Sequence, residues 1–181
     1  MTTVFTILIL ILSVVIHEVS HGWAAYALGD PTAKLAGRLT LNPLVHLDPM
    51  GSVFLPLLLF ITHSPILFGW AKPVPYNPYN LRAGRWGPAI VALAGPVSNL
   101  FLAGVFSIII RLTMGAVPIA FFQLTAMIVI INLGLAIFNL IPIPPLDGSK
   151  IFFALIPYRY RAIEETLTRY QLFFVILVIT L

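Results

Sequence analysis

Two histidines and a glutamate stand close together in an otherwise apolar stretch, where residues 17–21 read "HEVSH". On an α-helix, His17 and His21 lie one turn apart on the same face, so their imidazoles can bind one metal ion. Glu18 is rotated by about 100° from His17, which brings its carboxylate near that ion but directs it at a water molecule. Two imidazoles beside a carboxylate are typical of zinc hydrolases, in which the carboxylate takes a proton from the activated water.

A catalytic zinc site needs a third protein ligand and one open position. Asp147 is the preferred third ligand, because the proline-rich stretch 142–145 ends the preceding helix and is expected to leave an extended strand that presents it. Gly148 gives the backbone further freedom, although an Asp-Gly pair after prolines is by itself more typical of a turn. Asp48 is the rival, on a loop close to the first helix. The other residues with suitable side chains are Asp30, His46, His63, Glu164 and Glu165.

The composition indicates where this motif lies. Only 9% of the 181 residues are charged and 60% are hydrophobic, whereas soluble domains carry roughly a quarter of charged residues. We therefore predict an α-helical polytopic membrane protein whose surroundings are the lipid bilayer. A carboxylate near the middle of a membrane helix costs about 2.5–3.5 kcal/mol, which argues against a mere packing role for Glu18. The net charge of +4 does not indicate nucleic acid, because the basic residues lie in loops between apolar stretches.

Prolines and apolar runs divide the chain into elements. We predict membrane-spanning helices at about 4–28, 88–112 and 119–141, which form a three-helix catalytic core in a single membrane-embedded domain, 1–181. The apolar run at about 51–62 is too short to span and is predicted to be a re-entrant or β-hairpin-like segment. The last apolar run, "QLFFVILVITL", is barely half a span, so the chain is expected either to be truncated at Leu181 or to have its additional C-terminal helix begin earlier, near Glu164, which gives a helix at about 164–181.

The distribution of basic residues predicts the orientation of these elements. If the first helix runs inward and the segment at 51–62 returns to the inner face, only Arg111 lies outside. If that segment spans the membrane, the agreement is lost. The residues on the cytoplasmic side are then Lys34, Arg38, Lys72, Arg82, Arg85, Lys150, Arg159, Arg161 and Arg169.

Three motifs together resemble the site-2 protease family of intramembrane zinc metalloproteases. They are "HEVSH", "AGPVSN" at 94–99 and "NLIPIPPLDG" at 139–148, and the stretch "GWAKPVP" resembles the compact prokaryotic branch of that family. The resemblance covers about residues 14–150. It implies a multi-pass protein of the cell membrane, with its active site within the membrane near the cytoplasmic side. The expected substrate is a transmembrane protein, cut in or near its membrane segment.

The resemblance also implies a role for individual residues. One Zn²⁺ per chain would be bound by His17, His21 and Asp147, with Glu18 as the general base. Asn139 would position or polarise the scissile peptide. A helical substrate hides its carbonyls in its own hydrogen bonds, so it must be unwound, and an extended edge of this chain could receive it as an added strand. The residues proposed for that edge are Gly69, Trp70, Ala71, Lys72, Pro73, Val74 and Pro75, for which a plain proline-rich connector is the alternative.

Other interpretations assign the polar residues differently. A zinc or proton transporter would carry ionisable residues along several helices, but the spans 88–112 and 119–141 contain only Arg111. An inactive zinc-binding scaffold would need the ligands but not Glu18. Within "AGPVSN", Gly95, Pro96 and Asn99 are expected to allow close helix packing more than to take part in catalysis. His46 and Asp48 are typical of a turn.

Overall fold

The computed structural model describes residues 2–54, 57–58, 61–62, 71–157 and 161–171, and every regular element among them is helical. Three helices are long and apolar enough to cross a membrane, over Thr3–Ala27, Gly84–Thr113 and Ile119–Asn139. The predicted helical membrane protein with three spans is thereby confirmed. The described part of the chain contains no strand, so the β-hairpin-like alternative for 51–62 finds no support there.

Helix α1 spans Thr2–Ala27 and carries the "HEVSH" motif. No proline interrupts it, and its end is a glycine turn. Gly29 has a φ of +104°, which a residue with a side chain rarely adopts. The N–H of Gly29 donates to the Tyr26 carbonyl at 3.0 Å and that of Asp30 to the Ala25 carbonyl at 2.9 Å. These two bonds satisfy carbonyls that a helix end leaves without partners. Helix α1 therefore ends where Gly29 allows the turn that forms them.

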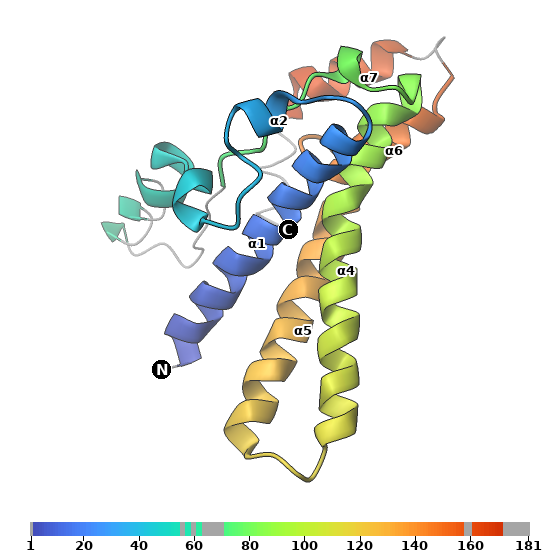
Figure 1. Ribbon diagram of the computed structural model, residues 1–181. Helices are drawn as coiled ribbons and strands as arrows, with labels where there is room; N and C mark the ends of the chain where they lie inside the picture. Colours follow the sequence, from blue (N-terminus) through green and yellow to red (C-terminus); the bar gives the residue numbers. More distant parts are fainter. Residues whose placement is uncertain (1, 55–56, 59–60, 63–70, 158–160, 172–181) are drawn as a thin grey trace.

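Helices α4 (Gly87–Thr113) and α5 (Ile119–Asn139) form an antiparallel hairpin, and α1 lies against it (Figure 1). Pro88 lies in the first turn of α4, where its missing N–H costs nothing. Pro96 lies inside α4, which continues through it. The hairpin therefore presents two spans to α1.

Short elements gather at the end of the bundle where α1 ends and α4 begins (Figure 1). They include α2 (Thr32–Leu35), the 3₁₀ turns η1 (Pro43–His46), η3 (Pro78–Asn80) and η4 (Gly84–Trp86), and the helices α6 (Asp147–Leu155) and α7 (Arg161–Arg169). The described part of the predicted C-terminal helix is α7, which begins before 164; residues 172–181 lie outside the described chain.

The segment predicted to re-enter the membrane is described only in part. It includes a short π-helix, η2 (Pro49–Phe54), while residues 55–56 and 59–60 lie outside the described chain. Its return to the inner face stays a prediction. The stretch 71–77 has no regular secondary structure, as its prolines predict.

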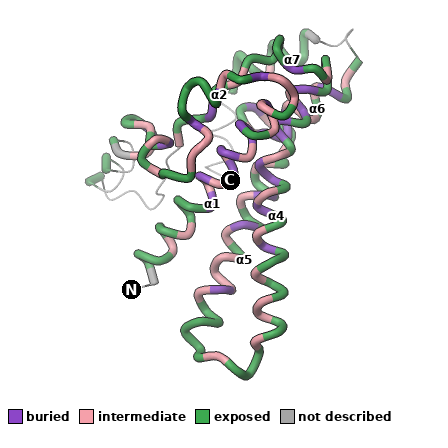
Figure 2. Tube along the Cα trace, viewed as in Figure 1, coloured by how far each residue is buried: buried purple, intermediate pink, exposed green. Residues whose placement is uncertain are grey.

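Buried positions concentrate where α1, α4, α5 and α6 meet, whereas the outer turns of the long helices are exposed (Figure 2). The buried apolar residues are mainly small, among them Ala25, Ala92, Ala103 and Ala136. Small side chains let membrane helices approach closely. The large apolar side chains point outward, as expected for a surface that faces lipid. Few large apolar side chains therefore fill the space between the helices, which leaves room there for polar side chains.

The carboxylate of Asp30 fastens the loop before α4 to the end of α1. It is fully buried and accepts hydrogen bonds from the Asn77 N–H at 2.6 Å and from Asn80 Nδ2 at 2.8 Å. It also accepts from the hydroxyl of Thr32 at 2.6 Å. Burial raises the pKa of Asp30, but these hydrogen bonds outweigh it, so the pKa lies below the ordinary value of an aspartate.

The side chain of Arg38 makes a second connection on the same side of α1. Its buried guanidinium donates to the carbonyls of Lys72 at 2.9 Å and Pro73 at 3.3 Å, and also to the carbonyl of Val45. Arg38 therefore fixes the stretch 71–75.

Candidate metal centre

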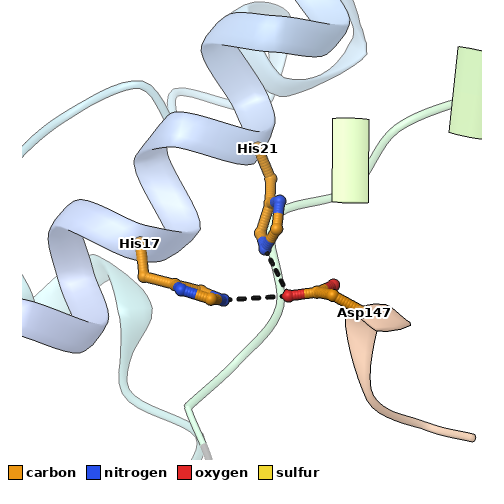
Figure 3. Close-up of side chains that lie close together, drawn as sticks. All are labelled: His17, His21 and Asp147. Atoms are coloured by element: carbon orange, nitrogen blue, oxygen red, sulfur yellow. Dashed lines mark hydrogen bonds and ion pairs between the residues drawn. The ribbon is translucent and has the colours of Figure 1, made fainter. Parts of the chain in front are cut away.

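The side chains of His17, His21 and Asp147 point toward one another (Figure 3). The Nε2 atoms of His17 and His21 lie 3.0 and 3.1 Å from the same oxygen, Oδ2 of Asp147. All three side chains are buried, and their ligand atoms lie within 4.8 Å of one another. The helical spacing of the histidines, predicted from sequence, accounts for two of the three. The third comes from α6, which follows 130 residues after His17 in the chain.

A glycine of α4 lets that helix pack directly against the two imidazoles. A Cβ atom on Gly95 would lie 2.5 Å from Cε1 of both His17 and His21, a separation that real Cβ atoms do not reach. The prediction that the "AGPVSN" motif allows close packing is thereby confirmed for Gly95. Its close neighbours are the site histidines themselves.

Asp147 reaches the site by a different backbone from the one expected. The proline-rich stretch forms consecutive turns, with hydrogen bonds from the Ile143 N–H to the Ile141 carbonyl and from the Leu146 N–H to the Ile143 carbonyl. Asp147 then begins helix α6. The extended strand predicted for this stretch is wrong, because the non-proline residues keep donors that close turns. Gly148 packs against the backbone of Leu140 so closely that a Cβ would overlap it, and this contact returns α6 to the bundle.

Hydrogen bonds on the far side of each ring decide which nitrogen faces the site. Nδ1 of His21 lies 2.7 Å from the backbone carbonyl of Val91, and Nδ1 of His17 lies 2.8 Å from Oδ1 of Asn99. Since these oxygens accept, each Nδ1 must carry the hydrogen. In the neutral rings, both Nε2 atoms then present lone pairs to the Asp147 carboxylate. Three acceptors facing one point require a cation between them, either protons or a metal ion.

The donor set fits zinc. Zn²⁺ binds imidazole nitrogen and carboxylate oxygen at about 2.0–2.2 Å in tetrahedral sites, which places neighbouring ligand atoms roughly 3.3–3.6 Å apart. The separations of 3.0 and 3.1 Å are a few tenths of an ångström shorter, so a small outward shift of the side chains would admit the ion. A hydrogen bond on the other ring nitrogen is also the usual second support of a metal-binding histidine.

The carboxylate of Glu18 lies outside the three-residue cluster, on the side of the stretch 71–75. Its Oε2 accepts a hydrogen bond from the Val74 N–H at 3.0 Å. Val74 is buried, and Arg38 holds the carbonyls of the two residues before it. The fixed backbone at Val74 therefore orients Glu18, which is next to a ligand in sequence but is not among the three ligand atoms.

Comparison with known proteins gives two consistent results. Residues 107–181 match the sequence profile of Peptidase family M50. The protein named "Putative zinc metalloprotease YwhC" from Bacillus subtilis (strain 168) is 41% identical over 165 residues, which cover 87% of this chain and 72% of that protein. The chain belongs to peptidase family M50. The resemblance to site-2 proteases is confirmed, and the chain is a helical membrane protein of the zinc metalloprotease type.

Two further relatives with lower identity also carry the name of a zinc metalloprotease. "Putative zinc metalloprotease Rip2" of Mycolicibacterium smegmatis is 32% identical over 138 residues, covering 76% of this chain and 52% of that protein. The Rip2 of Mycobacterium tuberculosis (strain H37Rv) is 33% identical over the same length and covers the same shares. The chain thus spans about half the length of the Rip2 proteins. No solved structure matches the chain.

The remaining residues proposed for the M50 site lie in different surroundings. Asn139 ends α5 and its Nδ2 donates to the Leu135 carbonyl, one turn back, at 2.9 Å. Asp48, the rival ligand, accepts from the N–H groups of Met50 at 3.0 Å and Gly51 at 2.7 Å. The turn predicted around Asp48 is confirmed, and the structure does not bring Asp48 to the two imidazoles.

The stretch proposed to receive substrate is described for Ala71 to Pro75, while residues 69–70 lie outside the described chain. Within 72–75 every backbone N–H is accounted for. That of Lys72 donates to the His46 carbonyl at 2.8 Å, that of Val74 donates to Glu18, and both prolines lack one. While these bonds hold, a substrate strand could therefore pair with this stretch only by donating its own N–H groups to the carbonyls of residues 72–75.

Sequence reasoning underestimated Asn99, which it assigned to helix packing. Asn99 is fully buried and accepts from the His17 ring, and its Nδ2 donates to Oδ1 of Asn132 at 3.1 Å. The only available signal was the presence of amide side chains in otherwise apolar membrane helices, where polar residues are expensive and need partners. Val91 gave no signal, because it contributes a backbone carbonyl.

Proposed function

We propose that this chain is an intramembrane zinc metalloprotease that hydrolyses peptide bonds in or near the transmembrane segments of membrane-protein substrates. The observation that carries the proposal is the convergence of two imidazole lone pairs and one carboxylate inside a helical membrane bundle. Such a cluster is costly in a membrane unless it holds a cation. Membership of peptidase family M50 supplies the reaction type.

In this proposal one Zn²⁺ per chain is held by His17, His21 and Asp147. A bound zinc ion supplies a Lewis acid that lowers the pKa of a water molecule and polarises a peptide carbonyl. The carboxylate of Glu18 takes the proton from that water and later delivers it to the leaving amine nitrogen. Before that step Glu18 is held by the Val74 N–H, so turning toward the water requires this bond to lengthen or break.

Two further parts of the chain are proposed to handle the substrate. The amide nitrogen of Asn139 carries a second hydrogen besides the one donated to Leu135, and we propose that it is donated to the carbonyl of the scissile peptide. The stretch 69–75 receives the unwound substrate. When Glu18 leaves Val74, the freed N–H becomes a donor for that substrate, which would couple binding of an extended peptide to release of the base.

We also place the active site within the cell membrane near its cytoplasmic side, in a single domain formed by residues 1–181. The basic residues counted above support this orientation. A transporter gains no support, because the buried polar residues of α4 and α5 are Asn99, Thr125 and Asn132, none of which ionises.

The exchange Glu18→Gln tests the proposal. Glutamine keeps an oxygen that can accept from the Val74 N–H but cannot take a proton from water. We expect the purified chain to retain one zinc per chain while cleavage of a transmembrane peptide in liposomes is abolished. The matched control is Glu164→Gln on α7, an exposed glutamate, which should keep wild-type cleavage. Near-normal turnover of Glu18→Gln would remove Glu18 from the mechanism.

A further inference from the structure

A row of hydrogen-bonded side chains continues from His17 through three helices. Oδ1 of Asn99 on α4 lies 2.8 Å from His17 Nδ1, and its Nδ2 lies 3.1 Å from Oδ1 of Asn132 on α5. Nδ2 of Asn132 then lies 3.0 Å from the hydroxyl of Ser13, back on α1. Both asparagines are 0% exposed and Ser13 is 4% exposed, so water does not substitute for these bonds.

The direction of this row is fixed at its far end. Nδ2 of Asn132 also lies 2.9 Å from the backbone carbonyl of Ile128. Since a carbonyl only accepts, the Asn132 atom facing it must be the amide nitrogen, and its oxygen must face Asn99. Asn99 must therefore turn its nitrogen to Asn132 and its oxygen to His17. A backbone carbonyl on α5 thus determines which atom of Asn99 meets the ring.

The two site histidines differ in how securely their rings are held. His21 donates to the backbone carbonyl of Val91, which has no alternative orientation. The partner of His17 is an amide, and an amide turned by 180° would offer an N–H to Nδ1. The Nδ1 atom would then have to accept, and the hydrogen would move to Nε2, where it would block a metal ligand. His17 therefore depends on whatever prevents Asn99 from turning.

We propose that Asn132 is a positioning residue, which locks the Asn99 amide and thereby holds His17 with a hydrogen on Nδ1 and a free Nε2 lone pair at the metal position. The inference rests on the proposed zinc site. A role in helix adhesion alone explains the row poorly, because hydrogen bonds between membrane helices contribute little net association. In contrast, hydrogen-bond partners behind a metal-binding histidine change metal affinity about 10–100-fold.

The test is the zinc affinity of the purified full-length chain, measured by competition with a chelator. We expect Asn132→Leu to bind zinc about 10–100-fold more weakly than wild type. Thr125→Val is the matched control, because Thr125 is also buried on α5 but bonds to the Phe121 carbonyl of its own helix. The control should bind zinc like wild type. If Asn132→Leu does not fold, Asn132→Ala is measured with the same expectation.

A double variant separates the relay from general packing. If Asn132 acts through Asn99, then Asn132→Leu added to Asn99→Leu should weaken zinc binding no further. Equal weakening with and without Asn99, or wild-type affinity in Asn132→Leu, would overturn the inference while leaving the zinc site in place. A wild-type chain that binds no zinc would overturn the proposed function and this inference with it.

Discussion

The two oxygens of Asp147 have different neighbours. Oδ2 faces both imidazoles, whereas Oδ1 lies 3.9 Å from Nζ of Lys150, one turn later on α6. The lysine cation also lies 5.5 Å from the centre of the Tyr76 ring. One oxygen is thus directed at the metal position while the other is partly compensated by a partly exposed cation. This division favours an ionised carboxylate, the form a metal ligand needs.

Replacing this carboxylate tests its role. Asp147→Ala is expected to weaken zinc affinity by at least the roughly 10–100-fold that loss of a supporting partner causes, and therefore to lower zinc occupancy and eliminate cleavage. Asp48→Ala is the control, since Asp48 caps two backbone N–H groups of η2. It should affect folding or leave partial activity with zinc retained. Metal analysis that shows full zinc in Asp147→Ala and loss in Asp48→Ala would give Asp48 the ligand role.

The candidate site could be predicted from the sequence only in part. The spacing of His17 and His21 predicts a shared ion because it depends only on helix geometry. Asp147 is preferred because the prolines before it are expected to present it on an extended strand, whereas the structure presents it at the start of α6 after a series of turns. Asn99 and Asn132 could not be paired, since their contact depends on the relative rotation and depth of α4 and α5. No periodicity within either helix records that alignment.

At the scale of elements, the end of α1 and the loop before α4 form one unit. The Arg82 N–H donates to the Leu28 carbonyl at 2.9 Å, and the Asp30 carboxylate accepts from Asn77 and Asn80. This unit holds the stretch that orients Glu18. Sequence patterns predicted the helix end, because Gly29 and Pro31 stop a helix. They could not predict the partner loop, because the bonds of Asp30 reach about 50 residues along the chain.

The unit at Asp30 has a predictable pH dependence. The pKa of Asp30 is lower in the folded chain than in the unfolded one. The ionised carboxylate therefore stabilises the fold above the unfolded pKa of about 3.9, and this stabilisation is lost as pH falls through the folded pKa. Asp30→Asn should lower the thermal midpoint in detergent at pH 7, because the new amide N–H₂ faces donors. The difference from wild type should stay constant from pH 7 to about 5 and shrink below about 4. A difference that does not change with pH would contradict this account.

At the scale of the whole molecule, the described interior combines small apolar side chains with polar ones, and many of the large apolar side chains are exposed. Composition and apolar runs predicted the three spans correctly, because the bilayer requires about 20 apolar residues for each helix. Prolines alone could not specify the turns before α6, since a proline excludes a helix without selecting what replaces it.

The orientation of the molecule can be measured with single cysteines, because the chain has no cysteine of its own. Lys34→Cys and Arg82→Cys should label from the same side, the cytoplasm, since the segments that carry them are joined by the Arg82–Leu28 bond. Ala116→Cys, in the exposed turn between α4 and α5, is the control and should label from the opposite side. Labelling of Lys34→Cys and Arg82→Cys from opposite sides would mean that the segment at 51–62 spans.

The separation of 130 residues between His17 and Asp147 has a consequence for biosynthesis. The two imidazoles enter the membrane with α1, whereas the carboxylate emerges only after both later spans have been made. A partly synthesised chain therefore carries the histidine motif without a complete site. Under the proposed function, a nascent chain cannot attack neighbouring membrane proteins, and proteolytic competence appears only once translation has passed α6 and the bundle has closed.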